Sequence, residues 1–204
     1  MKKLIYLVML IISFVSCQEK YLSYNDAMNK CLENVTISEF ELENGEKGVS
    51  YSNLDINCIK GAQLPEFITS SLDGKEYHTK DLKGKINIIN FWFKACKPCV
   101  AEIPGLNIIA NRYIDQRINF LSISYDDDKT LNEFVSKNEY RFIHFLNGKE
   151  IIRDKFKHKF GFPTTIITNR NLEIVEMYSG GNSDTSAIQE TVNKLDPIIK
   201  ELIK

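Results

Sequence analysis

The sequence predicts an α/β fold in which a mixed central sheet is flanked by helices and preceded by an N-terminal extension. Strand and helix patterns alternate from Gly61 to the C-terminus, and a short turn separates the last two strands. Alternation that ends in a hairpin is typical of a sheet with both parallel and antiparallel strands, covered on both sides. With 204 residues, 43% of them hydrophobic, the chain can form one principal domain with a leader and an extension.

The charges nearly cancel. There are 26 Lys and Arg against 27 Asp and Glu, which gives a formal net charge of −1. The net charge therefore gives no reason to expect nucleic acid or an anionic membrane surface as a partner. Function has to be sought in local motifs.

Residues 1–17 have the layout of an export signal. Lys2 and Lys3 precede an apolar run over residues 4–15, which is shorter than the roughly 20 residues of a membrane-spanning helix. The segment ends in Phe-Val-Ser-Cys, similar to the lipobox of bacterial lipoproteins, whose cysteine is acylated. We expect a lipoprotein-type signal peptide and a periplasmic or extracytoplasmic protein anchored to a membrane through an acylated Cys17. A plain secretory signal is the alternative.

Five cysteines leave one unpaired, and lipidation of Cys17 would account for it. The others form a close pair, Cys96 and Cys99, and a distant pair, Cys31 and Cys58. In an oxidising compartment the distant pair is a candidate structural disulfide, worth about 3 to 4 kcal/mol by loop-closure entropy. Two free buried thiols are the alternative, since spacing does not fix connectivity.

Residues 18–60 form the N-terminal extension, where weak alternation of apolar residues predicts one or two strands. The main domain covers residues 61–204 and begins with Asp73-Gly74, a turn signal between two short strands. The β-rich run over residues 86–93 suits a buried central strand. The later predicted elements are a helix over 100–113 kinked at Pro104, a strand over 118–125, a helix over 129–138, a strand over 141–145, a short helix over 150–157, a hairpin of 164–168 and 173–178, and a helix over 184–202.

The motif Cys96-Lys97-Pro98-Cys99 lies where the central strand gives way to the next helix. Pro98 suits a first helical turn, and the positive end of the helix dipole lowers the pKa of the Cys96 thiol. We therefore expect Cys96 to be the nucleophile and Cys99, one turn later, to be the resolving cysteine. The charge of Lys97 should favour the Cys96 thiolate and make the disulfide more oxidising.

A Cys-x-x-Cys motif can also belong to a zinc site or to a purely structural bridge. A zinc site needs four ligands, but the chain has no second such motif and its three histidines are scattered, so we expect no metal and no cofactor. A structural bridge has the same spacing as a redox pair. The strand-to-helix location favours redox activity over that bridge.

The run from Asn90 to Pro104, around the cysteine motif, resembles the TlpA/ResA group of extracytoplasmic thioredoxin-like oxidoreductases. The resemblance extends from Gly61 to the C-terminus and includes the segment Gly-Phe-Pro-Thr-Thr at residues 161–165. It implies a thioredoxin-like fold, a cis-proline at Pro163 opposite the disulfide, and pairing of the Phe162 backbone with bound substrate. Without the resemblance, Pro163 would read as an ordinary proline at a strand entry.

This chain departs from the pattern at two places. Ala95 stands where a tryptophan usually precedes the first cysteine, which leaves substrate preference open. Asn90 stands where thioredoxins proper have a buried acid, so an acid that assists Cys99 must come from elsewhere. Asp126 is our candidate. The alternative is that the three aspartates from Asp126 to Asp128 simply cap the following helix.

These observations predict a thiol–disulfide oxidoreductase, acting as a reductant on exported disulfide-containing proteins and kept reduced by a membrane thiol electron donor. Apocytochrome c is one substrate that the resemblance implies. A peroxiredoxin-like thiol peroxidase is an alternative, although such enzymes need a threonine three residues before the reactive cysteine, where Phe93 stands. A non-enzymatic lipoprotein module that binds a partner through its extension is another.

Overall fold

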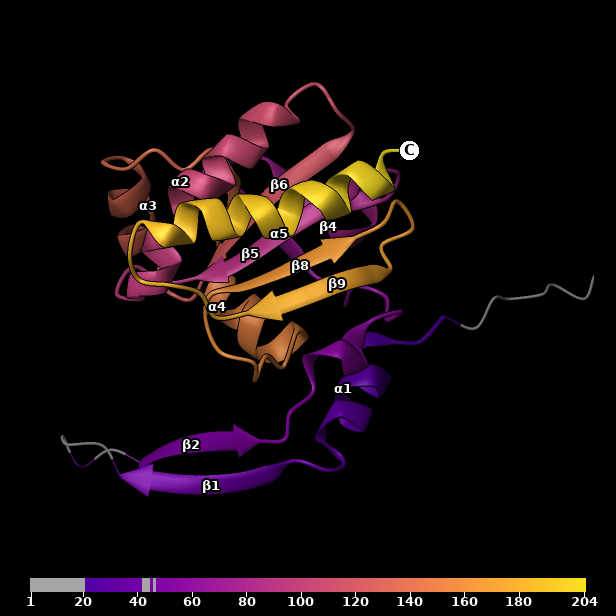
Figure 1. The fold of residues 1–204 in the computed structure, drawn as a ribbon, viewed down its shortest axis with the longest axis vertical. Helices are drawn as coiled ribbons and strands as arrows, with labels where there is room; N and C mark the ends of the chain where they lie inside the picture. The colour runs from indigo at the N-terminus through magenta and orange to yellow at the C-terminus, as the bar shows by residue number, and fades with distance from the viewer. Residues whose placement is uncertain (1–20, 42–44, 46) are drawn as a thin grey trace, which may run out of the picture.

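The centre of the protein is a five-stranded mixed sheet (Figure 1). The computed structural model describes residues 21–41, 45 and 47–204. Strands lie in the order β7-β6-β5-β8-β9. Their bounds are β5 Ile86–Trp92, β6 Ile118–Ser124, β7 Ile143–Phe145, β8 Thr164–Thr168 and β9 Ile174–Ser179. Strands β5, β6 and β7 run parallel to one another, β8 is antiparallel to β5, and β9 is antiparallel to β8. The predicted mixed sheet with a late hairpin is therefore confirmed.

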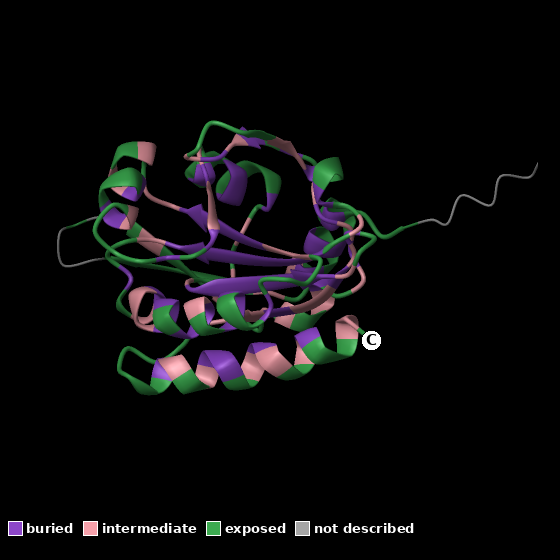
Figure 2. Ribbon diagram, turned by 90° about the horizontal axis from the view of Figure 1, so that it is seen from above, coloured by how far each residue is buried: buried purple, intermediate pink, exposed green. Residues whose placement is uncertain are grey.

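Three helices cover one face of the sheet: α2 (Lys97–Arg112), α3 (Asp128–Val135) and α5 (Ser186–Leu202). Figure 2 shows the buried strands between this layer and the segments on the opposite side. Helices α2 and α5 approach closely at Gly105, where a Cβ atom would lie 2.6 Å from the Ile188 carbonyl oxygen. Glycine is therefore required there by space rather than by backbone angle.

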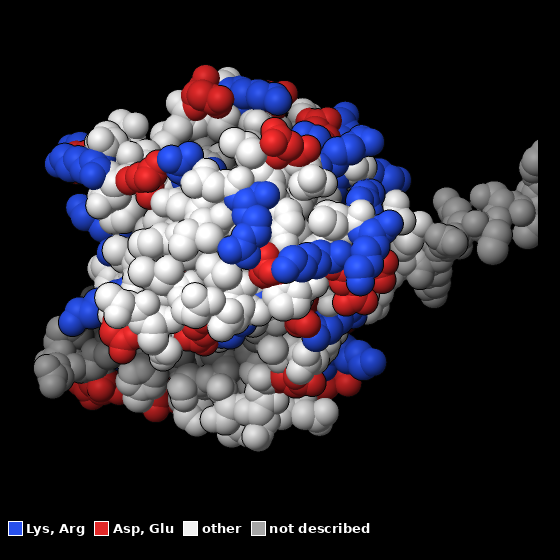
Figure 3. Space-filling view, turned by 45° about the horizontal axis from the view of Figure 1, so that its top comes forward, with Lys and Arg blue, Asp and Glu red and all other residues white. Residues whose placement is uncertain are grey.

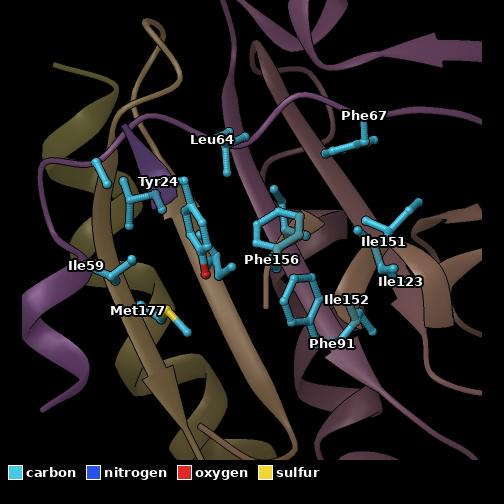
Figure 4. Close-up of a cluster of buried hydrophobic side chains, with 14 of the residues drawn as sticks. Tyr24, Ile59, Leu64, Phe67, Phe91, Ile123, Ile151, Ile152, Phe156 and Met177 are labelled. Atoms are coloured by element: carbon cyan, nitrogen blue, oxygen red, sulfur yellow. The ribbon is translucent and has the colours of Figure 1, made fainter. Parts of the chain in front are cut away.

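The opposite face is covered by α1 (Tyr24–Leu32), the 3₁₀-helix η1 (Ile56–Ile59), the short α4 (Gly148–Glu150) and the π-helical turn η3 (Ile151–Lys155). Aromatic rings form the centre of this core (Figure 4). The Phe156 ring lies 4.8 Å from the Phe91 ring and 5.2 Å from the Tyr24 ring, between centroids. The core therefore draws one of its rings from α1.

The extension is thus built into the main core, which the weak strand pattern did not predict. No helix is predicted before residue 60, whereas α1 spans nine residues and is capped by the Ser23 side chain. Its buried residues are Tyr24, Ala27, Met28 and Cys31, a helical spacing in which polar neighbours obscure the apolar face. Leu22 also forms a β-bridge with Ala62.

The two strands of the extension, β1 (Thr36–Glu41) and β2 (Lys47–Ser52), form an antiparallel ribbon that stands away from the body (Figure 1). A disulfide between Cys31 and Cys58, with Cα atoms 5.5 Å apart, joins α1 to η1 at the base of this ribbon. The ribbon carries exposed apolar side chains; Ile37, for example, is 62% exposed.

The remaining elements agree with the sequence in kind but differ at their ends. Strands β3 (Ile68–Ser70) and β4 (Glu76–His78) flank the predicted Asp-Gly turn, in which Gly74 has φ +84°, and η2 (Thr79–Leu82) follows. The expected helix over 150–157 is the pair α4 and η3, and the strand expected over 141–145 is confined to its last three residues. Among the described residues, no helix is both long and apolar enough to cross a membrane.

Candidate active site

The Cys96–Cys99 pair lies at the junction of β5 and α2, four residues after the strand ends. Cys96 is the N-cap of α2, and its Sγ accepts a hydrogen bond from the Cys99 backbone N–H at 3.3 Å. The two residues form a disulfide with Cα atoms 5.2 Å apart. Cys96 keeps 7% of its surface exposed while Cys99 is wholly buried, so only Cys96 is open to a partner.

The residues around the pair explain this placement. Pro98 lies in the first turn of α2, where its missing N–H costs no hydrogen bond. Lys97 is exposed beside it, and Ala95 is exposed before Cys96. The N-terminus of this 16-residue helix brings unpaired N–H groups and a partial positive charge to the Cys96 sulfur.

Asp126 ties the loop before the cysteines to the end of β6. Its carboxylate accepts a hydrogen bond from the Lys94 backbone N–H at 2.6 Å and another from the Ser124 hydroxyl at 2.9 Å. The cap of α3 is Asp127 instead, whose side chain accepts from the Thr130 N–H. Asp126 therefore holds the backbone of the cysteine loop, a contact the sequence did not predict.

The segment before β8 forms the other wall of the site. The Phe162–Pro163 peptide bond is cis. The Phe162 ring packs against Phe93 of the cysteine loop at 5.3 Å and against Tyr125 at 5.6 Å, measured between centroids. The loop that carries Cys96, the end of β6 and the loop that carries Pro163 therefore meet at one edge of the sheet.

His158 supports the Pro163 loop from inside, a role that its isolated position in the sequence did not indicate. Its ring contacts Phe91, Phe160 and Phe162, and its Nε2 lies 2.7 Å from the Gly161 carbonyl oxygen. Because a carbonyl only accepts, Nε2 must carry the proton. Burial lowers the pKa of His158 to about 4, so the ring is neutral at physiological pH.

Glu102 is a second site residue that was not predicted from the sequence. It is 4% exposed on α2, one turn beyond Cys99, and its Oε1 accepts a hydrogen bond from Asn90 Nδ2 at 2.7 Å. Asn90 Nδ2 also donates to Thr165 Oγ1 at 3.1 Å, and Asn90 Oδ1 accepts from the Tyr140 hydroxyl at 2.9 Å. Burial raises the pKa of Glu102 to about 7, against the opposing effect of the Asn90 hydrogen bond.

The spacing Cys-x-x-Cys-x-x-Glu was the available signal for this residue. Positions three apart lie on one side of a helix, so a carboxyl at residue 102 shares the buried side with Cys99. In the sequence, Asn90 stands where thioredoxins proper have a buried acid. In the structure it instead orients the carboxyl of Glu102, which comes from α2.

The sequence also led us to expect no metal site, a lipidated Cys17 and a nearly neutral net charge. Within the described segments, no three His, Cys, Asp or Glu side chains are grouped so as to hold a metal ion. Cys17 lies outside the described residues. On the face in Figure 3, Lys and Arg are interspersed with Asp and Glu, and a broad area is uncharged, as the net charge suggests.

Comparison with known proteins agrees with this geometry. A family model described as the AhpC/TSA family matches residues 60–189. The thiol-disulfide oxidoreductase ResA of Bacillus thuringiensis subsp. konkukian is 27% identical over 139 residues, which is 67% of this chain and 79% of that protein. The thioredoxin-like protein YneN of Bacillus subtilis is 28% identical over 151 residues, 72% of this chain and 85% of its own.

A solved structure shares the fold. The crystal structure of the thioredoxin domain of a thiol-disulfide oxidoreductase from Bacteroides vulgatus aligns with a TM-score of 0.54 and 23% identity. The alignment covers 66% of this chain and 98% of that domain. This likeness bears on the fold alone, which is thioredoxin-like.

Proposed function

Because this chain belongs to the AhpC/TSA family and is a thiol–disulfide oxidoreductase of the TlpA/ResA type, we propose that Cys96 and Cys99 are its redox pair and reduce exported protein disulfides. The observation that carries the proposal is the asymmetry of the pair. Cys96 keeps 7% of its surface exposed at the N-terminus of α2, whereas Cys99 is wholly buried one turn along.

In the first step, the Cys96 thiolate attacks one sulfur of a substrate disulfide. The other substrate sulfur leaves as a thiolate and takes a proton from solvent, and a mixed disulfide to Cys96 remains. Charge at the helix N-terminus and the neighbouring Lys97 stabilise the attacking thiolate, which Pro98 helps to position at the helix start.

In the second step, Cys99 loses its proton and attacks the Cys96 sulfur. The bond between Cys96 and the substrate breaks, the second substrate sulfur leaves as a thiolate, and the Cys96–Cys99 disulfide forms. Two electrons pass from the dithiol to the substrate. A thiol donor in the membrane then reduces the disulfide and restores the enzyme.

We assign the proton of Cys99 to Glu102 rather than to Asp126. Glu102 is buried on the same side of α2 as Cys99, and a pKa of about 7 lets its carboxylate accept a proton near neutral pH. Asp126 is engaged with the Lys94 backbone, so its role is to position the cysteine loop.

The loop at Pro163 is the proposed substrate-binding element. The ring contact between Phe162 and Phe93 holds the Pro163 loop against the loop that carries Cys96. An extended substrate segment would pair with the Phe162 backbone and bring its disulfide to Cys96.

The proposed setting is the extracytoplasmic face of a membrane, with residues 1–17 as a signal peptide, an acylated Cys17 as the anchor, residues 18–60 as an extension and 61–204 as the catalytic domain. Cytochrome c maturation is one process that supplies substrates of this kind. Membrane fractionation of wild type and Cys17→Ser tests the anchor, because the variant should be released into the soluble fraction.

Turnover with a model protein disulfide tests the chemistry. Cys96→Ser should abolish turnover, because no other thiol is exposed at the site. Cys99→Ser should accumulate the mixed disulfide, visible by mass spectrometry. Activity that survives Cys96→Ser would overturn the proposal, and hydrogen peroxide consumption by the wild type at a rate matching disulfide turnover would favour a peroxidase instead.

A further inference from the structure

A small polar cavity, with room for about one water molecule, lies between α2, β9 and α5 and is lined by the buried Glu102. It is lined by side chains from α2, β9 and α5, among them Glu102, Tyr178, Glu190 and Lys194. Backbone at the two glycines Gly180 and Gly181 forms one wall. The residues of α5 that line the cavity are Ala187, Glu190, Thr191 and Lys194.

Two buried polar atoms in this lining lack partners. Neither the Tyr178 hydroxyl nor Glu190 Oε2 makes a hydrogen bond among the described residues, although both are shielded from solvent. Buried polar groups are almost always satisfied by protein or by ordered water. A polar cavity of this size with two such atoms suits a single water placed between Glu102 and the partly exposed Glu190.

Two opposite charges lie at the exposed edge of this cavity. Lys194 Nζ pairs with Glu190 Oε1 at 2.6 Å and lies 5.2 Å from the centre of the Tyr178 ring. Both charged side chains are about one third exposed, so they contact solvent and the cavity together. The positive charge of Lys194 lowers the pKa of Glu102, and the negative charge of Glu190 raises it.

Resting on the function proposed above, we propose that this cavity carries protons between Glu102 and solvent, and that Glu190 and Lys194 control how firmly Glu102 holds its proton. The other groups that face Glu102 are uncharged. They include Asn90 from β5, which donates to Glu102, Tyr140 from the segment before β7, Tyr178 from β9 and Thr191 from α5.

The chemical step is the transfer of one proton for each disulfide exchange. When Cys99 attacks, its proton passes to the Glu102 carboxylate, and the neutral acid then releases it through the cavity to water at Glu190. When the donor reduces the disulfide, the proton returns by the same route to the Cys99 thiolate. Glu102 ends each cycle in its starting state.

The test is a ¹³C NMR titration of the Glu102 carboxyl in the purified oxidised chain, assigned by its loss in Glu102→Gln. Lys194→Met removes a positive charge and should raise the pKa of Glu102, while Glu190→Gln removes a negative charge and should lower it, each by at least about 0.5 unit. Lys200→Met is the matched control, because Lys200 lies on the same helix in an equivalent i, i+4 pair with Asp196 outside the cavity. It should leave the titration unchanged.

A kinetic measurement follows the same three variants. An aromatic disulfide releases one thiolate when Cys96 attacks and a second when Cys99 resolves the mixed disulfide. At pH 7 the second release should slow about twofold or more in Lys194→Met, because fewer Glu102 carboxylates are free to accept a proton. The first release should not change.

Shifts of equal sign in the two cavity variants, or a control shift as large as theirs, would overturn the inference. Unchanged titrations would overturn it too. The titration needs no turnover, so its outcome is separate from that of the proposed function, which is tested by the turnover of Cys96→Ser and by hydrogen peroxide consumption.

Discussion

Glu102 should make the stability of the protein depend on pH in a way that Glu102→Gln removes. The carboxyl titrates at its ordinary pKa of 4.5 in the unfolded chain but at about 7 in the folded one, because burial disfavours the anion. Between these values the folded state binds more protons, so the free energy of unfolding falls as pH rises. The loss is complete above pH 7 and amounts to about 3 kcal/mol, from about 2.5 pKa units at 1.36 kcal/mol each.

Urea unfolding of the oxidised protein, followed by the fluorescence of the buried Trp92, measures this directly. The glutamine side chain keeps an oxygen that can accept the Asn90 hydrogen bond. We expect the stability difference, variant minus wild type, to rise by about 3 kcal/mol from pH 4 to pH 8. Comparison of the two pH values cancels any constant effect of the substitution. A flat difference for Glu102→Gln would refute the reasoning.

Three further predictions concern the scaffold and the substrate loop. Replacing Cys31 and Cys58 by alanine should destabilise the protein by about 3.5 kcal/mol, since the bridge closes a loop with a sequence separation of 27, and lower Tm by about 7 to 14 °C in calorimetry. Gly105→Ala should cost about 1 to 3 kcal/mol in urea unfolding, because its Cβ would meet the Ile188 carbonyl. His158→Leu removes the hydrogen bond to the Pro163 loop and should raise KM for a disulfide substrate about fivefold, with kcat little changed.

Each of these has a control that isolates its cause. Turnover by Cys96 should persist in the variant without the Cys31–Cys58 bridge, and its loss would show that the second disulfide takes part in exchange. Gly181→Ala should be nearly neutral, because the nearest atom to its Cβ, in Pro163, is 3.8 Å away. His158→Gln keeps an N–H donor and should recover part of the affinity. A leucine variant with wild-type KM would contradict the role of His158.

The fold was predictable because its signals are local. The run at β5 is apolar in every position but two, and it is followed directly by a motif whose proline suits a helix start. Helix α1 escaped prediction because only four of its nine residues are buried, and the ring that contacts its Tyr24, Phe156, lies far along the chain. Contacts with residues so far along the chain leave no clear apolar periodicity in the sequence of the extension.

The site residues also divide into those that the sequence predicts and those that only the structure reveals. The cysteine pair and Pro163 are visible in short motifs, whereas Glu102 and His158 owe their properties to burial. A glutamate three residues after Cys99 reads as a surface charge on a helix, and only its contact with Asn90 on β5 reveals a carboxyl held inside the protein. Asp126 was singled out as an acid, but its hydrogen bond to Lys94 was not readable from spacing.

The β-bridge between Leu22 and Ala62 limits how far the catalytic domain could lie from a lipid anchor at the N-terminus. Only four residues lie between Cys17 and Leu22, so the two Cα atoms are five residue steps apart and at most about 17 Å from each other when the chain is fully extended. A chain acylated at Cys17 would therefore work on a short tether, with no reach across the surrounding compartment. Its substrates and its electron donor would have to come to the membrane surface.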